Sequence, residues 1–283
     1  MMPNAAPEVY HGGAAMANKR ITIRLVGSKG DGGHLRLSDF IDQLEAFSEA
    51  LRQTERLLSG QDRASVYYKI VELSYHSPAT MTIEGASSKD SPVKPTEVMQ
   101  TFVADVRALS RKKPPAKLDL AMLEAYRGLS RPLEKHVHQV EIIETKNKII
   151  PIDHAFTENV DAVIGPDSFS FGSISGRLER VNLHHTYRFE IYPTVGPKRV
   201  KCDFRADLKQ KVKKALDSYV TVSGRLRYKQ WDRYPHAIDA RDIDTHEDEG
   251  RLASLHDLRG VAPKATGTMS AEDFVRSIRD ANW

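Results

Sequence analysis

Histidine pairs are the first residues in this chain whose type and spacing could support metal or acid–base chemistry. His184 and His185 are adjacent. Adjacent residues of a strand point to opposite faces, so these two rings are poorly placed to bind one metal ion, and we interpret them as exposed turn residues. His136 and His138 share a face of a predicted strand, with two glutamates at most as further ligands. The sequence therefore predicts no metal site.

Other catalytic signals are equally weak. The glycine-rich run from Gly27 to Gly33 lacks the Gly-Lys-Ser/Thr ending of a phosphate-binding loop, and we interpret it as a connector. The single cysteine, Cys202, provides neither a disulfide framework nor a Cys-rich zinc site. No Ser/His/Asp set is recognisable from spacing. We expect a binding protein without a cofactor, with an enzyme whose site lies unrecognised in the first domain as an open alternative.

The last fourteen residues predict a well-signalled helix. Ser270 is the expected N-cap, Asp273 at the third helical position would close a capping box, and Met269 would pack against Phe274 as a hydrophobic staple. A helix of about eleven residues is marginal alone in water because nucleation is costly. It therefore needs a surface to lie on, which is either this protein's own domains or a groove of a partner.

Residues Asp257–Gly260, Ser270–Phe274 and Arg276–Asp280, followed by Trp283, resemble the C-terminal tails of antitoxins that neutralise PIN-domain ribonucleases. The resemblance covers about thirty residues and implies that the tail helix covers a carboxylate pocket that holds divalent metal. It also implies that Arg276 or Arg279 enters the pocket, since a guanidinium pairs bidentately with carboxylates. The expected partner-binding residues are Leu258, Phe274, Val275, Arg276, Ile278, Arg279 and Trp283.

The rest of the chain departs from that family. Such antitoxins are usually short and carry a ribbon-helix-helix or swapped-hairpin head that binds DNA, and neither signature is present among these 283 residues.

The second half of the chain carries an excess of positive charge. The whole chain has a net charge of +4, but from Gly176 to Arg241 there are sixteen Lys and Arg against seven Asp and Glu. This asymmetry is typical of a protein with an anionic partner, and equally of a charged surface that keeps a small domain soluble.

Strand patterns in this half alternate with period two. They cover residues 169–181, 187–191, 200–204, 220–228 and 236–243, with a helical pattern at 207–218. The order β-β-β-α-β-β resembles an OB fold, a five-stranded barrel with a helix between its third and fourth strands. A ferredoxin-like arrangement would need a helix after the first strand, and none is patterned there. We therefore expect an OB-like β-barrel over residues 169–243.

OB folds bind single strands by stacking bases on aromatic rings along a basic groove, which makes single-stranded nucleic acid the alternative partner. Tyr187 and Tyr228 share the inward face of their strands and are expected in the core. The candidate nucleic-acid-binding residues are Arg188, Tyr192, Lys198, Arg199, Arg225, Arg227, Lys229, Trp231 and Tyr234.

The first half predicts an α+β domain over about residues 19–152. Its expected strands are 21–26, 65–74, 80–84, 137–144 and 149–152, and its expected helices are 37–58, 96–109 and 118–129. Residues 1–18 read as a disordered leader, 153–168 as a connector with a short helix, and 244–283 as a flexible linker with the partner-binding helix. No segment reaches the ~20 apolar residues of a membrane-spanning helix. We expect a cytoplasmic protein.

Overall fold

The computed structural model describes residues 20–134, 136–145, 148–184, 186–246 and 266–280. The chain divides into two compact units, unit 1 (Met1–Pro166) and unit 2 (Asp167–Trp283), which are described separately. The division falls between Pro166 and Asp167, within the predicted connector 153–168. The predicted α+β class is confirmed, since helices and antiparallel strands both contribute to the fold.

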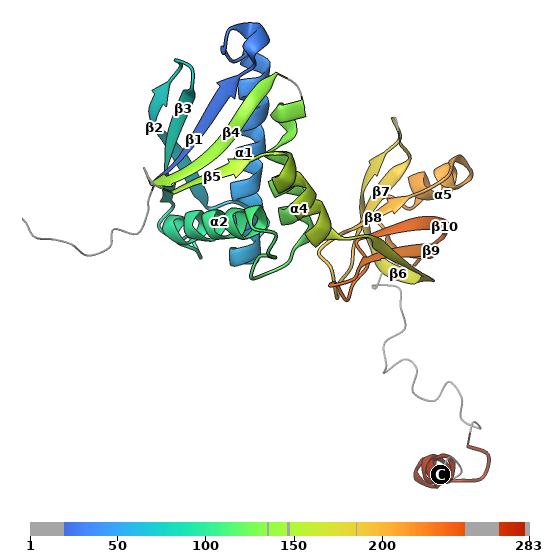
Figure 1. Cartoon of the computed structure of the whole chain (residues 1–283). Helices are drawn as coiled ribbons and strands as arrows, with labels where there is room; N and C mark the ends of the chain where they lie inside the picture. Colours follow the sequence, from blue (N-terminus) through green and yellow to red (C-terminus); the bar gives the residue numbers. More distant parts are fainter. Residues whose placement is uncertain (1–19, 135, 146–147, 185, 247–265, 281–283) are drawn as a thin grey trace, which may run out of the picture. The chain divides into compact units, whose positions relative to one another are not determined.

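Unit 1 contains a five-stranded antiparallel sheet in the order β2-β3-β1-β4-β5 (Figure 1). Its strands are β1 (Arg20–Gly27), β2 (Val66–Ser74), β3 (Ala79–Ser87), β4 (Val137–Thr145) and β5 (Lys148–Ile152). Along β1, Ile21, Ile23 and Leu25 are buried, whereas the alternate residues are half-buried. One face of the sheet therefore faces the core, in keeping with the period-two pattern by which the strand was predicted.

Four helices supply the rest of the core of unit 1. They are α1 (Leu37–Ser59), α2 (Pro95–Ser110), α3 (Leu120–Gly128) and α4 (His154–Ile164). Phe102 of α2 contacts Phe47 of α1 and Tyr126 of α3 edge to face, with ring centroids 5.5 and 5.7 Å apart. All three rings are buried, so α1, α2 and α3 meet at one aromatic centre.

Helix α4 differs from the expectation that residues 153–168 form a connector. Asp153 caps it by accepting a 2.8 Å hydrogen bond from the Phe156 backbone N–H. Phe156 and Val160 are buried, and the helix contacts α2, α3 and β5. Because its apolar face is covered within unit 1, α4 belongs to the core of that unit.

In unit 2, five strands form a closed barrel in the order β10-β8-β7-β6-β9 (Figure 1). They are β6 (Asp167–Asn182), β7 (Arg188–Tyr192), β8 (Val200–Asp203), β9 (Tyr219–Lys229) and β10 (Ala237–Thr245). The β10–β8 pair is parallel, and the other pairs are antiparallel. Between β8 and β9 lie the short helices η3 (Ala206–Leu208) and α5 (Lys209–Lys214). The predicted order of elements is confirmed.

Helix α5 ends earlier than the predicted helix 207–218. Asp217 adopts a left-handed φ of 63°, which an α-helix does not contain. Its backbone N–H donates to the Leu178 carbonyl at 2.8 Å, so the chain turns there to meet β6. In the sequence, the helical spacing of apolar residues continues past the end of α5, and the prediction therefore placed the end of the helix too late.

The interior of the barrel contains Leu178, Phe189, Ile191, Val222 and Ile238 among other buried residues. Tyr187 and Tyr228 pack against this core as partly buried rings, as their inward position in the sequence pattern predicted. Beyond the barrel, the structure describes the C-terminal helix α6 (Ala271–Asp280). Within the described ranges, no helix is both long and apolar enough to cross a membrane.

Candidate functional site

Helix α6 begins where its sequence signals placed it. The Ser270 hydroxyl accepts a 3.1 Å hydrogen bond from the Asp273 backbone N–H and donates to the Asp273 carboxylate at 2.7 Å. The first backbone bond of the helix runs from the Phe274 N–H to the Ser270 carbonyl at 3.0 Å. Ser270 is therefore the N-cap, and one of the two bonds of the predicted capping box, from the Asp273 backbone N–H to the Ser270 hydroxyl, is present, whereas the Asp273 carboxylate accepts from the Ser270 hydroxyl.

The apolar side chains of α6 lie on one side of the helix, where Val275 and Ile278 are exposed and Phe274 is half-buried. Phe274, Val275 and Ile278 follow three- and four-residue steps, which place them on one face. Val275 and Ile278 are 49% and 48% exposed, and no residue of α6 is buried. Among the described residues, this apolar face is therefore at most partly covered.

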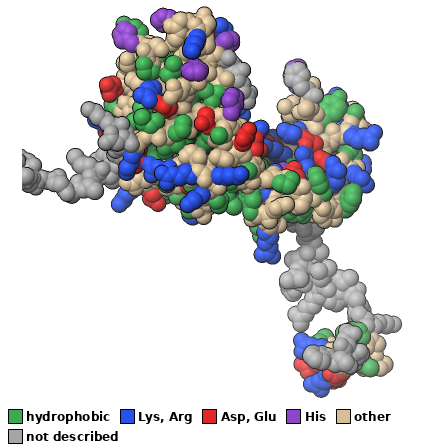
Figure 2. Space-filling model, in the orientation of Figure 1, with side chains coloured by type: hydrophobic (Ala, Val, Ile, Leu, Met, Phe, Trp, Pro, Cys, Tyr) green, Lys and Arg blue, Asp and Glu red, His purple; other side chains and the backbone are tan. Residues whose placement is uncertain are grey.

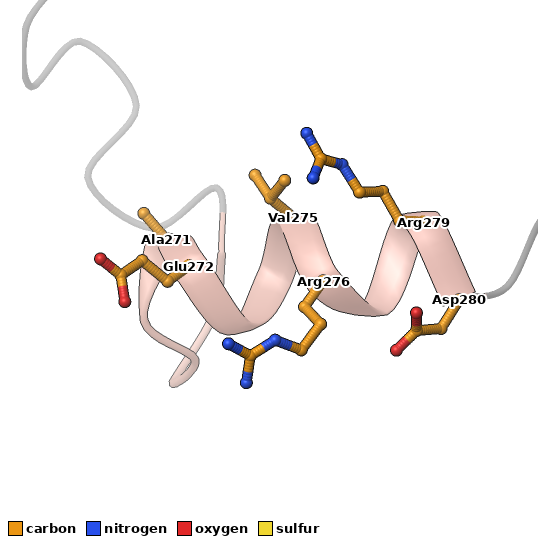
Figure 3. Close-up of a pocket in the computed structure, with 6 residues that line it drawn as sticks. All are labelled: Ala271, Glu272, Val275, Arg276, Arg279 and Asp280. Carbon is orange, nitrogen blue, oxygen red and sulfur yellow. The ribbon is translucent and has the colours of Figure 1, made fainter.

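Charged residues flank that face along an open depression (Figure 3). Its lining consists of Ala271, Glu272, Val275, Arg276, Arg279 and Asp280. Arg279 extends on the side that carries Val275, whereas Arg276 extends away from it (Figure 3). Arg276 is paired with Asp273 at 4.0 Å, and no ion pair of Arg279 is found among the described residues. The other two expected partner-binding residues, Leu258 and Trp283, lie outside the described residues.

Many Lys and Arg side chains of unit 2 form ion pairs with carboxylates of the same unit. At least eight of the sixteen Lys and Arg from Gly176 to Arg241 form ion pairs within the unit. On the visible face of this unit, positive and negative side chains are interspersed (Figure 2). The local charge excess is therefore distributed over a mixed surface.

One network of these ion pairs crosses four strands. Arg188 on β7 donates to Asp203 on β8 at 2.6 Å, and Arg227 on β9 contacts the same carboxylate. Arg227 also lies 3.2 Å from Asp239 on β10, which Arg225 binds at 2.8 Å. Burial tends to raise the pKa of Asp203, but the hydrogen bonds from the two arginines lower it below its ordinary value. These arginines are held on the barrel by their own acidic neighbours.

Lys229, a predicted nucleic-acid-binding residue, is buried. Its ammonium lies 2.6 Å from the Asp167 carboxylate, which also contacts His236 at 3.0 Å. Burial opposes ionisation of Asp167, but its hydrogen bonds with Lys229 and His236 lower its pKa. Because the surrounding atoms cover Lys229, it cannot reach a phosphate, and its role here is to join the start of β6 to the end of β9.

The other predicted residues occupy varied positions. Arg199 lies 3.5 Å from Glu190, and the half-buried Tyr192 donates to the same carboxylate at 3.3 Å. Lys198 is exposed, and Trp231 is half-buried. The ring of Tyr234 is 37% exposed and lies against Gly196.

Two exposed rings on β6 form a more regular arrangement that sequence reasoning missed. Phe169 and Phe171 are 55% and 66% exposed. The Arg225 guanidinium lies 4.7 Å from the centre of the Phe169 ring, and Arg241 lies 4.7 Å from that of Phe171. The signal was present: both phenylalanines are odd-numbered, whereas Ile174 and Leu178, which pack in or against the barrel core, are even-numbered, so alternation along β6 puts the two rings outside.

No family model matches the chain, and neither does any curated protein or solved structure.

The histidines that the sequence pairs lie in different surroundings. The His136 ring lies 2.8 Å from the Arg36 guanidinium and 3.3 Å from the buried Asp39 carboxylate, whereas His138 is exposed on β4. His184 lies exposed near the turn after β6. His185 lies outside the described residues. In the described part of the chain, no group of three or more His, Cys, Asp or Glu side chains could hold a metal ion.

Proposed function

We propose that this chain is an antitoxin-like binding protein that neutralises a PIN-domain ribonuclease through α6. The observation that carries the proposal is an amphipathic, capped helix none of whose ten residues is buried. A helix of this length is marginal alone in water. An apolar face that stays exposed on such a helix is a binding surface for another molecule.

The chemistry of the helix suits a metal-binding nuclease pocket. Phe274 and Ile278, four residues apart, would enter an apolar groove of the partner, with Val275 beside them. Arg279 borders this face and would form bidentate hydrogen bonds with the carboxylates that hold the divalent metal. In a desolvated pocket this guanidinium competes with Mg²⁺ for the negative charge. The resemblance of residues 257–283 to antitoxin tails supports the same assignment of roles.

Deletion of residues 270–283 tests the proposal. The proposal places a PIN-domain reading frame beside this gene, and the full chain and the truncated chain are each expressed together with its product. The full chain is expected to restore growth and inhibit the ribonuclease, and the truncated chain to do neither while both units stay folded. Full rescue by the truncated chain, or no PIN-domain reading frame beside the gene, would overturn the proposal.

A pair of matched substitutions separates the apolar face from general effects on the helix. Ile278→Gln removes an apolar anchor, whereas Asp280→Gln introduces the same residue on the charged side of α6 (Figure 3). Truncating a central anchor of an interface costs about 2 kcal/mol or more, which is roughly a thirtyfold loss of affinity. We expect this loss for Ile278→Gln and less than threefold for Asp280→Gln in a calorimetric titration with the ribonuclease.

A second candidate function is binding of single-stranded nucleic acid by an OB-like barrel. The observation that favours it is the pair of exposed rings, Phe169 and Phe171, each beside an arginine. Stacking of a base on an aromatic side chain contributes about 1–3 kcal/mol. The strand order β-β-β-α-β-β and the closure of the five strands support the OB-like assignment.

Binding of a mixed-sequence single-stranded oligonucleotide, measured by fluorescence anisotropy, tests this candidate. Phe171→Ala is expected to weaken binding about fivefold or more, and Tyr75→Ala, at an exposed aromatic residue of unit 1, to leave it unchanged. Binding through phosphates also weakens steeply with rising salt, whereas docking of α6 through its apolar face persists. Equal affinities of both variants and the parent would overturn the candidate.

A further inference from the structure

The two edge strands of the sheet in unit 1 differ in how well they are protected against pairing with a further strand. At one edge, β5 has five residues and contains Pro151, whose ring removes a backbone donor. At the other edge, β2 has nine residues and no proline. Among the described residues, no strand pairs with the outer side of β2. An edge of this length can accept another strand.

Apolar side chains are concentrated at this edge. Tyr67, Ile70, Val71 and Leu73 of β2 are 52%, 58%, 42% and 55% exposed, and Tyr75, just after the strand, is 82% exposed. Ile70 and Leu73 lie opposite the buried Ile83 and Met81 of β3 in the register of the sheet. They therefore project on the side of the sheet that the helices cover, but at its edge, where they stay exposed.

A β-bulge sets the faces of β2. Lys69 is opposite Glu84 and Ile70 is opposite Ile83, but the next paired residue is Glu72, opposite Thr82. The extra residue, Val71, changes the alternation. Because positions 84 and 82 of β3 share a face, Lys69 and Glu72 also share a face, although they are three residues apart. Without the bulge they would point to opposite faces.

We propose that β2 pairs antiparallel with β2 of a second copy of this chain, around a twofold axis between Ile70 and Val71. This register places Lys69 of each copy opposite Glu72 of the other. It also places Tyr68 opposite Leu73 on the helix-covered side and Tyr67 opposite Ser74 on the other side. In each of these three opposed pairs the two residues share a face, as directly opposed residues of antiparallel strands must.

Charge and symmetry identify the occupant as a second copy. One twofold axis forms two Lys–Glu pairs at once, since the strand carries both charges at equal distances from the axis. The exposed Ile70 and Val71 of both copies meet at the centre, where they lose contact with water. The pairing would join the two sheets into one antiparallel sheet of ten strands. It does not depend on the proposed function of α6.

Charge reversal tests this register in the full-length protein. Lys69→Glu gives a chain with two acidic residues at the axis, and Glu72→Lys gives one with two basic residues. Like charges directly opposite are destabilising and occur twice in each dimer. In sedimentation equilibrium we expect the dissociation constant of each variant dimer to rise about tenfold. Lys148→Glu, the same change at the other edge of the sheet, is expected to leave it unchanged.

Mixing the two variants is the decisive measurement. A Lys69→Glu chain and a Glu72→Lys chain place opposite charges across the axis, so they are expected to form a heterodimer with at least the affinity of the parent. The double variant Lys69→Glu/Glu72→Lys is expected to recover the parent dimer. Restored affinity in a mixture cannot arise from the folding of either chain alone. A parent protein that stays monomeric, or variants that fail to complement each other on mixing, would overturn the proposal.

Discussion

The side chains of Arg276 and Arg279 diverge on α6: Arg279 extends beside Val275, and Arg276 extends away from it (Figure 3). Only Arg279 therefore borders the apolar face that is expected to enter the partner. Arg276 already has a partner in Asp273, one turn earlier. The two arginines, although three residues apart, should contribute unequally to binding.

We predict that Arg279→Ala weakens inhibition of the ribonuclease by about 2 kcal/mol or more, because it leaves the partner's carboxylates desolvated and unpaired. Arg276→Ala is expected to cost about 1 kcal/mol or less, as for an exposed charge. Inhibition constants measured against one ribonuclease preparation provide the comparison. Lys213→Ala in α5 controls for loss of positive charge elsewhere in the chain, and equal effects of all three substitutions would indicate general electrostatic attraction.

Removal of the N-cap should weaken the helix without touching its apolar face. In Ser270→Ala, the Asp273 backbone N–H loses its acceptor, which costs about 1 kcal/mol of helix stability. We expect faster hydrogen exchange at the first turn of α6 in the free protein. We also expect about fivefold weaker partner binding, since binding must then order a less stable helix. Ser277→Ala, inside the helix, is the matched control and should not weaken binding, because alanine favours a helix interior.

The pH dependence of stability in unit 1 should depend on Asp105. This carboxyl group is buried beside Tyr126, whose hydroxyl lies 3.2 Å from it, and burial raises its pKa from 3.8 to about 6 despite that hydrogen bond. Between these two values the folded protein binds a proton that the unfolded chain releases. The free energy of unfolding contributed by this group therefore falls as the pH rises through that window.

Asp105→Asn removes this titration and keeps an acceptor for the Tyr126 hydroxyl. The variant is expected to gain stability relative to the parent as the pH rises from about 4 to about 7 in denaturant titrations. Asp90→Asn, at an exposed position of the same unit, controls for the change in net charge. A difference in stability that stays constant with pH would contradict the prediction.

The elements of both units could be predicted from the sequence because their local signals agree with the final packing. Alternation in β1 and the Ser270 cap of α6 are examples in which the local and tertiary requirements coincide. The end of α5 was predicted too late, because the turn at Asp217 serves a contact with β6 that spacing does not encode. Likewise, α4 was assigned to a connector because its apolar face is short and two of the elements that it contacts, α2 and α3, lie far away in the sequence.

The candidate surfaces were predicted less well than the fold. The excess of Lys and Arg in unit 2 could be read from the composition. Which carboxylate each of them pairs with depends on which residues the strands bring side by side. Asp203 is fifteen residues from Arg188 and twenty-four from Arg227 along the chain. The exposed Phe169 and Phe171 could have been found from alternation alone, whereas the bulge that aligns Lys69 with Glu72 depends on the register of β2 with β3.

The close approach of β9 to β10 at Gly224 provides a prediction on the barrel itself. A Cβ atom at this position would lie 2.2 Å from the Asp239 carbonyl oxygen, which is part of the neighbouring backbone. Because a backbone oxygen cannot rotate away as a flexible side chain can, Gly224→Ala must separate the two strands. Gly224 pairs with Ala240 next to the irregularity in the β9–β10 register, where the barrel bends.

We expect Gly224→Ala to destabilise unit 2 by about 2–4 kcal/mol, the range for forced overpacking with loss of backbone pairing. Gly30→Ala in unit 1 is the matched control, because the nearest atom to its added Cβ is the Ser28 hydroxyl oxygen at 3.8 Å. Hydrogen exchange resolved by residue measures the effect, since it separates the opening of unit 2 from that of unit 1. Unchanged protection of the β9 and β10 amides in the Gly224 variant would show that the barrel tolerates a wider spacing at this bend.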